Sequence, residues 1–309
     1  MKGATRRPCS RGSLLLSVHS NYHREVETQK LAWQSRVVLL AVIAPITISL
    51  IWQTSFWSIH APRVAAWGLG LSALLGLAAW KARSATAPAA VTGALITAAL
   101  MFSTFTSPYR AWNTALIPIL GVLILTSIAT RFGRRRKERL GTAEKRHGRG
   151  AAQVCANLGF AALICAPAVQ SRLGILATFA AYACLAEALA DTVSSEIGQV
   201  LGGQPFLLTT LRRVPAGTDG GISVAGTLAG TLASGVIGLL AAIVLHGRWT
   251  TACVISVAGI FGLLFDSLLG ATLERKEWLN NDAVNFLSTA SAAVFELVLL
   301  QSLWKVIPL

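Results

Sequence analysis

The chain has 309 residues, of which 54% are hydrophobic and 13% charged, and its mean hydropathy is +0.60. An ordinary soluble domain carries about 25% charged residues, so this composition excludes a soluble enzyme and indicates an integral membrane protein. The net charge of +14 does not favour a nucleic-acid partner. The densest basic run, residues 131–149, lacks alternating aromatic residues, and basic runs beside membrane spans bind anionic lipid headgroups.

Nine apolar segments each approach the roughly 20 residues that a helix needs to cross the hydrocarbon core. Helices are expected because an open sheet edge in lipid leaves backbone groups without hydrogen bonds. Residues 1–33 are expected to form a mobile basic cytosolic tail, residues 34–80 two extra N-terminal spans, and residues 81–309 the main transmembrane domain. The sequence thus predicts an all-α polytopic bundle of about nine transmembrane helices, at residues 34–53, 63–80, 87–105, 111–130, 151–170, 173–190, 222–245, 250–272 and 284–306.

Lys and Arg are distributed unevenly between the loops. If the N-terminus is cytosolic, the tail and the even-numbered loops hold twenty-two of the 27 Lys and Arg residues, and the opposite side holds five. Because positively charged loops remain in the cytosol, this split predicts an N-in, C-out topology. We expect a protein of the bacterial cytoplasmic (inner) membrane, surrounded by the lipid bilayer.

The first polar motif follows the basic loop, where Arg149 precedes a predicted span. Gln153 and Asn157 are four residues apart and therefore share one face of the helix. Such side chains commonly form hydrogen bonds between membrane helices. Alternatively, they belong to a polar site at the cytosolic end of the span.

The second motif is acidic and lies at the end of a long apolar run. Glu187, Asp191 and Ser195 form one helical stripe, and Glu196 follows directly. Charge at membrane depth is costly, so such a cluster is by default a candidate site. Carboxylate and hydroxyl oxygens suit a hard cation such as Mg²⁺. The alternative is a cluster that is solvated at the cytosolic interface.

A glycine-rich loop, residues 214–221, precedes the next predicted span. Its glycines and the following helix N-terminus favour a phosphate, and the two arginines before it add positive charge. The alternative is a tight interfacial turn. The residues predicted to bind phosphate here are Arg212, Arg213, Gly217, Thr218, Gly220, Gly221 and Ser223. The following helix carries small residues at four-residue spacing, which predicts close helix packing: Gly226, Gly230, Ser234 and Gly238.

The last two motifs are Asp266, within an apolar span, and a pair of asparagines, Asn281 and Asn285, on one face of the final span. By the predicted topology, every polar motif falls at the cytosolic side. Five motifs at one face are hard to explain by packing alone. The sequence therefore predicts an active site at the cytosolic face.

The order of these motifs resembles the family that contains plant phytyl-phosphate kinase and animal transmembrane protein nineteen, known as domain of unknown function ninety-two. The resemblance covers about residues 81–309 and is firm from residue 148. The motifs that carry it are Gly148-Arg149 with Gln153-Val154 and Ala156-Asn157; Asp191-Thr192 with Ser194-Ser195-Glu196 and Gly198; Val214-Pro215 with Gly217-Thr218, Gly220-Gly221 and Ser223; Asp266-Ser267 with Leu269-Gly270-Ala271; and Asn280-Asn281 with Val284-Asn285.

The resemblance implies a kinase that transfers a phosphoryl group from CTP, or another nucleoside triphosphate, to an isoprenyl monophosphate. With the residue patterns, it predicts Mg²⁺ at Asp191, Glu196 and Asp266 and catalytic roles for these three residues and for Asn281 and Asn285. Besides the loop residues above, Arg149, Gln153, Asn157 and Ser195 are predicted to bind the substrates. The nucleotide, the isoprenoid chain length and the oligomeric state stay open at this point.

Two other classes of function are weaker alternatives. A transporter or lipid flippase would relay ions through intramembrane carboxylates, and it would show midplane polar groups and an inverted repeat. A non-enzymatic scaffold would not need several acidic and phosphate-type motifs. The sequence shows no clear repeat and its polar groups cluster at one face, so the kinase is favoured.

Overall fold

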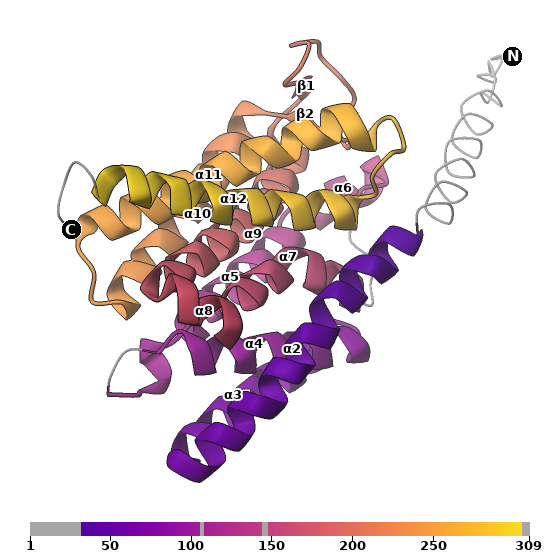
Figure 1. The fold of residues 1–309 in the computed structure, drawn as a ribbon. Coiled ribbons are helices and arrows are strands. Elements are labelled where there is room, and N and C mark those ends of the chain that lie inside the picture. Colours follow the sequence, from indigo (N-terminus) through magenta and orange to yellow (C-terminus); the bar gives the residue numbers. More distant parts are fainter. Residues whose placement is uncertain (1–31, 106–107, 144–147, 305–309) are drawn as a thin grey trace, which may run out of the picture.

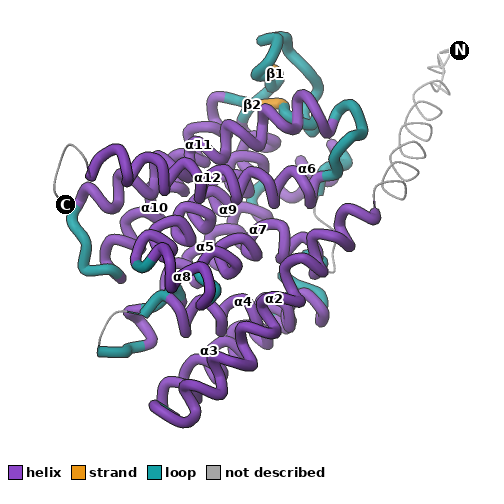
Figure 2. Tube along the Cα trace, viewed as in Figure 1, coloured by secondary structure: helices purple, strands orange, loops and turns teal. Residues whose placement is uncertain are grey.

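A computed structural model describes residues 32–105, 108–143 and 148–304, and most of these residues are helical (Figures 1 and 2). The predicted tail lies outside the described residues up to residue 31, and residues 32 and 33 begin the first helix. The elements are α2 (Ala32–His60), α3 (Pro62–Lys81), α4 (Ala87–Ser103), the 3₁₀ turn η1 (Ala111–Asn113), α5 (Leu116–Arg131), α6 (Arg134–Leu140), α7 (Ala151–Ile164), α8 (Pro167–Leu173), α9 (Ile175–Leu201), β1 (Phe206–Leu207), β2 (Gly221–Ile222), α10 (Val224–Val244), α11 (Trp249–Leu269), the π-helical turn η2 (Gly270–Glu274) and α12 (Asn281–Trp304).

Helices cover most of the described part of each of the nine predicted apolar segments, but not every one qualifies as a membrane span. Within the described ranges, six helices are long and apolar enough to cross a membrane, and the count reaches eight if α5–α6 and α7–α8 are each one bent span. Helix α4, with 17 residues, falls short. The protein is therefore an all-α polytopic membrane protein with six to eight candidate spans, and its N-in orientation remains a prediction.

The two bends have local causes in the sequence. Helices α5 and α6 meet at 65°, and α7 and α8 at 52°. Gly133, between α5 and α6, has a left-handed φ of +60°, a conformation that suits glycine. Pro167 begins α8 and cannot donate a backbone hydrogen bond, so the helix ends before it.

Helix α9 lies at the centre of the bundle and contacts α5, α7, α10, α11 and α12 (Figure 1). The small residues of α10 make its closest contacts possible. A Cβ atom on Gly226 or Gly230 would lie 2.6 Å and 2.8 Å from the carbonyl oxygens of Ser194 and Ala190 of α9. On the same stripe, a Cβ on Gly238 would lie 2.4 Å from the Ala252 carbonyl oxygen of α11. The predicted packing stripe is thus confirmed.

Helix α2, one of the two N-terminal helices that the motifs leave unassigned, holds the loop before α12. The Gln34 amide donates to the Trp278 carbonyl oxygen (2.8 Å) and accepts from the Asn280 backbone N–H (2.8 Å). The Asn280 amide donates to the Ser35 hydroxyl (2.9 Å) and its oxygen caps α12 at the Ala283 N–H (2.9 Å). The start of α2 therefore fixes where α12 begins.

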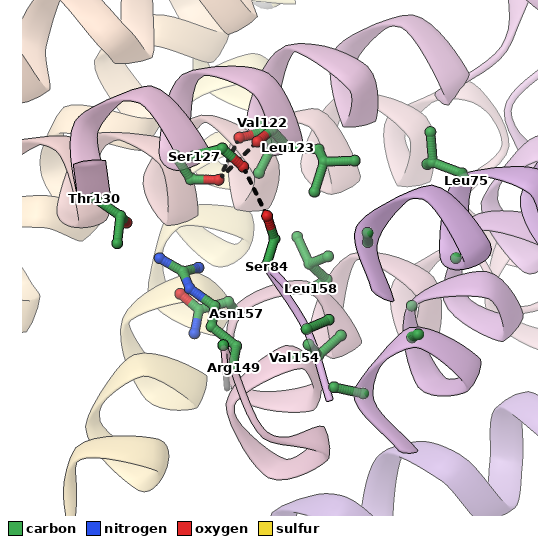
Figure 3. Close-up of a pocket in the computed structure, with 18 of the residues that line it drawn as sticks. Leu75, Ser84, Val122, Leu123, Ser127, Thr130, Arg149, Val154, Asn157 and Leu158 are labelled. Atoms are coloured by element: carbon green, nitrogen blue, oxygen red, sulfur yellow. Dashed lines mark hydrogen bonds between the residues drawn. The ribbon is translucent and has the colours of Figure 1, made fainter. Parts of the chain in front are cut away.

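The turn between α3 and α4 fixes the backbone of Arg149. The Thr86 N–H donates to the Arg149 carbonyl oxygen (3.0 Å), and the Arg149 N–H donates to the Ser84 carbonyl oxygen (3.1 Å). The Ser84 hydroxyl also lies 3.4 Å from that of Ser127 on α5 (Figure 3). Gly148, with φ +77°, permits this approach, since a Cβ there would lie 2.5 Å from the Ser84 carbonyl carbon. Arg149 is thereby held in place before α7 begins.

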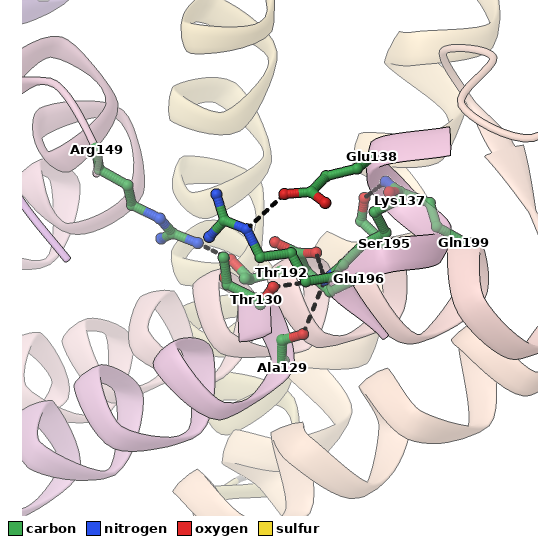
Figure 4. A network of polar contacts seen from close by, with 10 residues as sticks. Ala129, Thr130, Lys137, Glu138, Arg149, Thr192, Ser195, Glu196 and Gln199 are labelled. Atoms are coloured by element: carbon green, nitrogen blue, oxygen red, sulfur yellow. Dashed lines mark hydrogen bonds and ion pairs between the residues drawn. The ribbon is translucent and has the colours of Figure 1, made fainter. Parts of the chain in front are cut away.

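A buried lysine joins the basic helix α6 to the central helix. The Lys137 amine, only 1% exposed, donates to the carbonyl oxygens of Ala129 (3.1 Å) and Thr130 (2.7 Å) at the end of α5 and to the Glu196 carboxylate of α9 (Figure 4). The last carbonyls of a helix lack intrahelical partners, so one ammonium group caps α5 and neutralises a buried acid. This network sets the 65° turn between α5 and α6.

We expect the glycine-rich loop to face the cytosol, because the N-in topology that the positive-inside rule favours places this loop on the positively charged side. In a cysteine-free background, a single cysteine at Pro215, which is exposed in this loop, should react with an impermeant maleimide only after the cells are opened. A cysteine at Arg248, exposed at the start of α11, serves as the opposite control and should react in intact cells. Labelling of the Pro215 position in intact cells would place the loop away from the nucleotide pool.

We also expect Lys137→Met to lower the free energy of unfolding by about 3–5 kcal/mol, because it leaves the Glu196 carboxylate buried without its partner. Adding Glu196→Leu should recover most of this loss. The control is Glu138→Gln, which breaks only the exposed Arg134–Glu138 pair (3.1 Å) and should cost less than about 1 kcal/mol. Unfolding titrations in mixed micelles would measure the free energy of unfolding of the unmodified protein and of the three variants. Equal losses for Lys137→Met and Glu138→Gln would show that the buried pair does not anchor α6.

Candidate functional site

A polar cleft of about 520 Å³ opens where the end of α9, the start of α10, the end of α11 and the start of α12 meet. Helix α9 contributes Asp191, Ser194 and Ser195, and α11 contributes Asp266. The remaining walls are residues 216–223, the segment 274–281 and residues 141–143 after α6. Four of the five sequence motifs therefore reach one cleft, although they are up to 90 residues apart in the chain.

The lining of this cleft is strongly acidic. It contains Asp191, Asp219, Asp266, Glu274 and Glu277, and none of the described residues in the lining is Lys or Arg. Asp266 lies within electrostatic range of Asp191 and Glu274, and its Oδ2 atom is buried without a hydrogen-bond partner. Like charges repel strongly where the dielectric constant is low, and no Lys or Arg in the described lining offsets this repulsion.

The carboxylates fit a divalent cation that shares its coordination with a ligand. In the described part of the chain, no three His, Cys, Asp or Glu side chains are arranged to hold a metal ion by themselves. Mg²⁺ usually needs only one or two carboxylates, because substrate phosphates and water supply its other ligands. Asp191 and the unpaired oxygen of Asp266 meet this requirement.

Glu196, the third predicted metal ligand, lies away from this cleft. Its carboxylate accepts from Lys137 and it is absent from the cleft lining. The reason is helical geometry, since five residues after Asp191 the side chain points to another face of α9, where α6 packs. The structure thus gives Glu196 a partner in the fold and separates it from Asp191 and Asp266.

The glycine-rich loop lines the cleft, but its glycines also have packing roles. Gly217 and Gly220 have left-handed φ angles of +85° and +69°. A Cβ on Gly220 would lie 2.0 Å from the Ala271 backbone nitrogen, and one on Gly221 2.9 Å from the Thr218 carbonyl oxygen. A larger residue at Gly220 would therefore disturb the fold, so a loss of activity in such a variant would not test phosphate binding.

The two arginines before this loop lie outside the cleft lining. Arg212 and Arg213 are exposed on the β1–β2 hairpin, which projects from one end of the bundle (Figure 1). Their backbones pair with Leu207 and Phe206. Arg275 instead borders a smaller hollow beside Gly217 and Thr218. Arg275, rather than Arg212 or Arg213, therefore supplies positive charge beside the glycine-rich loop.

The other predicted residues divide between the cleft, the fold and a second cavity. Ser195 and Asn281 line the cleft, and Ser223 lines it while its hydroxyl caps α10 at the Gly226 N–H (3.1 Å). The Gln153 side chain accepts from the Gly150 N–H (2.7 Å), so it caps α7. Asn285 is half-buried and is not in the cleft lining. Arg149 and Asn157 line a second cavity, which meets α9 at Ala188, one turn before Asp191.

Sequence reasoning missed three acidic residues of the lining, Asp219, Glu274 and Glu277. Glu187, which shares a helical stripe with Asp191 as predicted, is fully buried one turn before it and lies outside the lining. Gly262 allows this packing, since a Cβ there would lie 2.4 Å from the Glu187 Cγ atom. Asp219, Glu274 and Glu277 lie in turns, where acidic residues are ordinary, so only the fold identifies them.

Comparison with known proteins places the chain in a family. Residues 70–293 match the family described as "Integral membrane protein DUF92". Protein VTE6, chloroplastic, of Arabidopsis thaliana is 33% identical over 221 residues, which are 67% of this chain and 64% of that protein. The "Uncharacterized membrane protein sll0875" of Synechocystis is 34% identical over 191 residues, 58% of this chain and 70% of its own length.

An archaeal protein shows the same relationship over a shorter region. The "Uncharacterized membrane protein MJ0933" of Methanocaldococcus jannaschii is 44% identical over 105 residues, 34% of this chain and 44% of that protein. No solved structure matches the chain. The family match covers most of the chain, from within α3 to within α12, and includes all of the motifs. The chain belongs to the DUF92 family of integral membrane proteins.

Proposed function

We propose that this protein is a membrane-embedded kinase that transfers the terminal phosphoryl group of CTP, or another nucleoside triphosphate, to an isoprenyl monophosphate and so forms the diphosphate. The resemblance of its five motifs to the family of plant phytyl-phosphate kinase supports this reaction. The acceptor's apolar tail accounts for a site inside a membrane protein. We further propose that the site faces the cytosol, where nucleotides are available.

The observation that carries this proposal is the separation of charge between two neighbouring cavities along α9. The cleft is lined by five acidic residues, and the second cavity, which meets α9 at Ala188, is lined by four arginines, Arg83, Arg131, Arg134 and Arg149. Arg149 connects the two cavities, because its guanidinium donates to the Thr192 hydroxyl (3.3 Å) and its charge acts on Asp191. A nucleotide with its cation in the cleft and a phosphate monoester in the second cavity would be complementary to this pattern.

The reaction that we propose balances without a proton acceptor. An oxygen of the acceptor phosphate attacks the terminal phosphorus of the nucleotide, and the bond from that phosphorus to the bridging oxygen breaks. The electron pair of that bond leaves with the nucleoside diphosphate, and the acceptor becomes the diphosphate. The attacking oxygen is already ionised at neutral pH, so the protein must mainly position the two substrates and offset their charge.

Each part of the cleft has a role in this scheme. Asp191 and Asp266 would hold Mg²⁺, which supplies positive charge to the phosphates when it is bound. Thr218, Ser194 and Ser195 present hydroxyl groups to the same space. The N-terminus of α10, beside Ser223, adds positive potential from its backbone N–H groups. Arg149 would orient the acceptor phosphate toward Asp191.

One observation favours the transporter alternative. Glu296, within α12, is fully buried and neither of its carboxyl oxygens has a hydrogen-bond partner in the described structure. An ion relay would use such a buried acid. Phosphoryl transfer would not, because Glu296 does not line the cleft. Glu296→Gln therefore separates the two functions.

We expect Asp191→Asn and Asp266→Asn to lower turnover by at least about a hundredfold, because each preserves shape but removes a charge that positions the cation. Purified protein in nanodiscs would be given labelled CTP or ATP, Mg²⁺ and a panel of prenyl monophosphates, and diphosphate formation would be measured. Glu296→Gln is the matched buried-acid control and should retain turnover. If Asp191→Asn turns over normally at saturating Mg²⁺, the residue has no role in the reaction.

We expect Asp266→Asn also to raise the Mg²⁺ concentration needed for half-maximal turnover, since one of the two carboxylate ligands is lost. A Mg²⁺ titration at fixed nucleotide measures this shift, and chelation of the metal should abolish turnover in the unmodified protein. An identical Mg²⁺ dependence in Asp266→Asn and the unmodified protein would exclude Asp266 as a ligand. Loss of activity in Glu296→Gln, with the cleft variants active, would instead favour a transporter.

A further inference from the structure

The second cavity, which meets α9 at Ala188 and which we call the arginine pocket, has an apolar part and a basic part. It has a volume of about 160 Å³ and lies between α3, α4, α5, α7 and α9. In Figure 3, Leu75 lies toward one end of the pocket, whereas Arg149, Asn157 and Thr130 lie toward the other. The wall between them is largely aliphatic, with Val122, Leu123, Val154 and Leu158. The pocket is therefore amphipathic along its length.

The basic part contains Arg83, Arg131, Arg134 and Arg149, and none of the described lining residues is Asp or Glu. Arg131 donates to the Ala82 carbonyl oxygen (3.3 Å), and Arg134 pairs with Glu138 outside the pocket (3.1 Å). Arg83 and Arg131 are exposed and Arg149 is half-buried, and together they make this end of the pocket positively charged. Guanidinium donors match the oxygen geometry of phosphate, which they bind in a bidentate manner.

The pocket is narrow for a lipid with two chains. Ligand pockets usually enclose about 300–1,000 Å³, so a cavity of about 160 Å³ accommodates a headgroup and the first part of one chain. The remaining chain has an apolar surface close by. A groove of about 500 Å³ between α3 and α4 shares Gly76 and Ala90 with the pocket and is lined by Leu77, Trp80 and Val91.

We propose that the arginine pocket is the binding site of a single-chain lipid monophosphate, with the phosphate among the arginines and the chain along the aliphatic wall. This inference rests on the proposed function, because it assigns the acceptor of that reaction to a place in the fold. Arg149 then links the two substrates, since it lines the pocket and donates to Thr192 beside Asp191. The acceptor phosphate meets the nucleotide at this point of α9.

The chain offers two substitutions that affect different ends of the pocket. Arg149→Met removes charge from the basic end and keeps an unbranched side chain. Gly93→Leu fills the apolar end, and the position tolerates a side chain because a Cβ there would meet only the Val154 Cγ1 atom, at 3.9 Å. Arg136→Met is the matched control, since Arg136 is exposed on α6 and outside the pocket lining.

Binding is measured without nucleotide or Mg²⁺, so that it does not depend on turnover. Full-length protein in phosphatidylcholine nanodiscs is titrated with radiolabelled farnesyl monophosphate. We expect saturable binding that Arg149→Met weakens by at least about tenfold, because a charge-assisted contact is lost. Gly93→Leu should weaken it by a similar factor, and Arg136→Met should leave it unchanged. Farnesol and inorganic phosphate at the same concentration should not displace the probe.

Three results would overturn the assignment. Unchanged affinity in both Arg149→Met and Gly93→Leu would place the ligand elsewhere. Equal displacement by inorganic phosphate would reduce the site to a free-anion site, and equal displacement by phosphatidate in the nanodisc would identify a bilayer headgroup as the occupant. If the proposed function is wrong but the pocket assignment is right, Arg149→Met and Gly93→Leu weaken binding of the probe as expected, Arg136→Met does not, and no diphosphate forms. If diphosphate forms and Arg149→Met keeps the acceptor KM, the kinase stands without this pocket.

Discussion

The cost of burying charge in a low-dielectric environment organises this protein. Asp191 and Asp266 face one cleft from two helices, and the described lining around them holds further acids but no Lys or Arg. Positive charge lies close by, in the arginine pocket, which meets α9 at Ala188, one turn before Asp191. In the function that we propose, a cation with a polyphosphate occupies the acidic cleft and a phosphate monoester occupies the arginine pocket.

This separation depends on how closely the helices pack. Gly226 and Gly230 bring α10 onto the backbone of α9, next to Ala190 and Ser194, and so place the start of α10 beside Asp191. Gly220 allows the glycine-rich loop to lie directly on the backbone at Ala271, after α11. Any side chain at these positions would push the walls of the cleft apart. The glycines thus determine the width of the site even where they touch no ligand.

Buried polar contacts from outside the motifs complete the site. Lys137 holds α6 against Glu196, and Gln34 holds the segment before α12. The α3–α4 turn fixes Arg149 through two backbone hydrogen bonds. Residues before the family match at 70–293, in α2, therefore support the position of Asn280 and Asn281 in the cleft. The N-terminal helices are part of the architecture of the site.

The sequence by itself determined the membrane class, the all-helical polytopic fold, the close-packing stripe and the family, whereas the predicted count of nine spans exceeds the six to eight candidate spans in the described residues. These follow from local composition and from spacing along one helix, which need no knowledge of neighbours. It also identified Asp191 and Asp266 as candidate site residues, because an isolated carboxylate in an apolar membrane segment has a high energetic cost in any fold.

Only the tertiary structure decided which partner each polar residue received. Glu196 lies five residues from Asp191, yet it faces Lys137, and Gln153 caps its own helix. Arg212 and Arg213 adjoin the glycine-rich loop in sequence but are exposed on the hairpin, whereas Arg83, in the turn between α3 and α4, and Arg131, at the end of α5, line the arginine pocket with Arg149. Helix rotation and packing set the partners of Glu196 and Arg149, and the motifs do not encode them because Lys137 lies 59 residues from Glu196 and Thr192 lies 43 residues from Arg149.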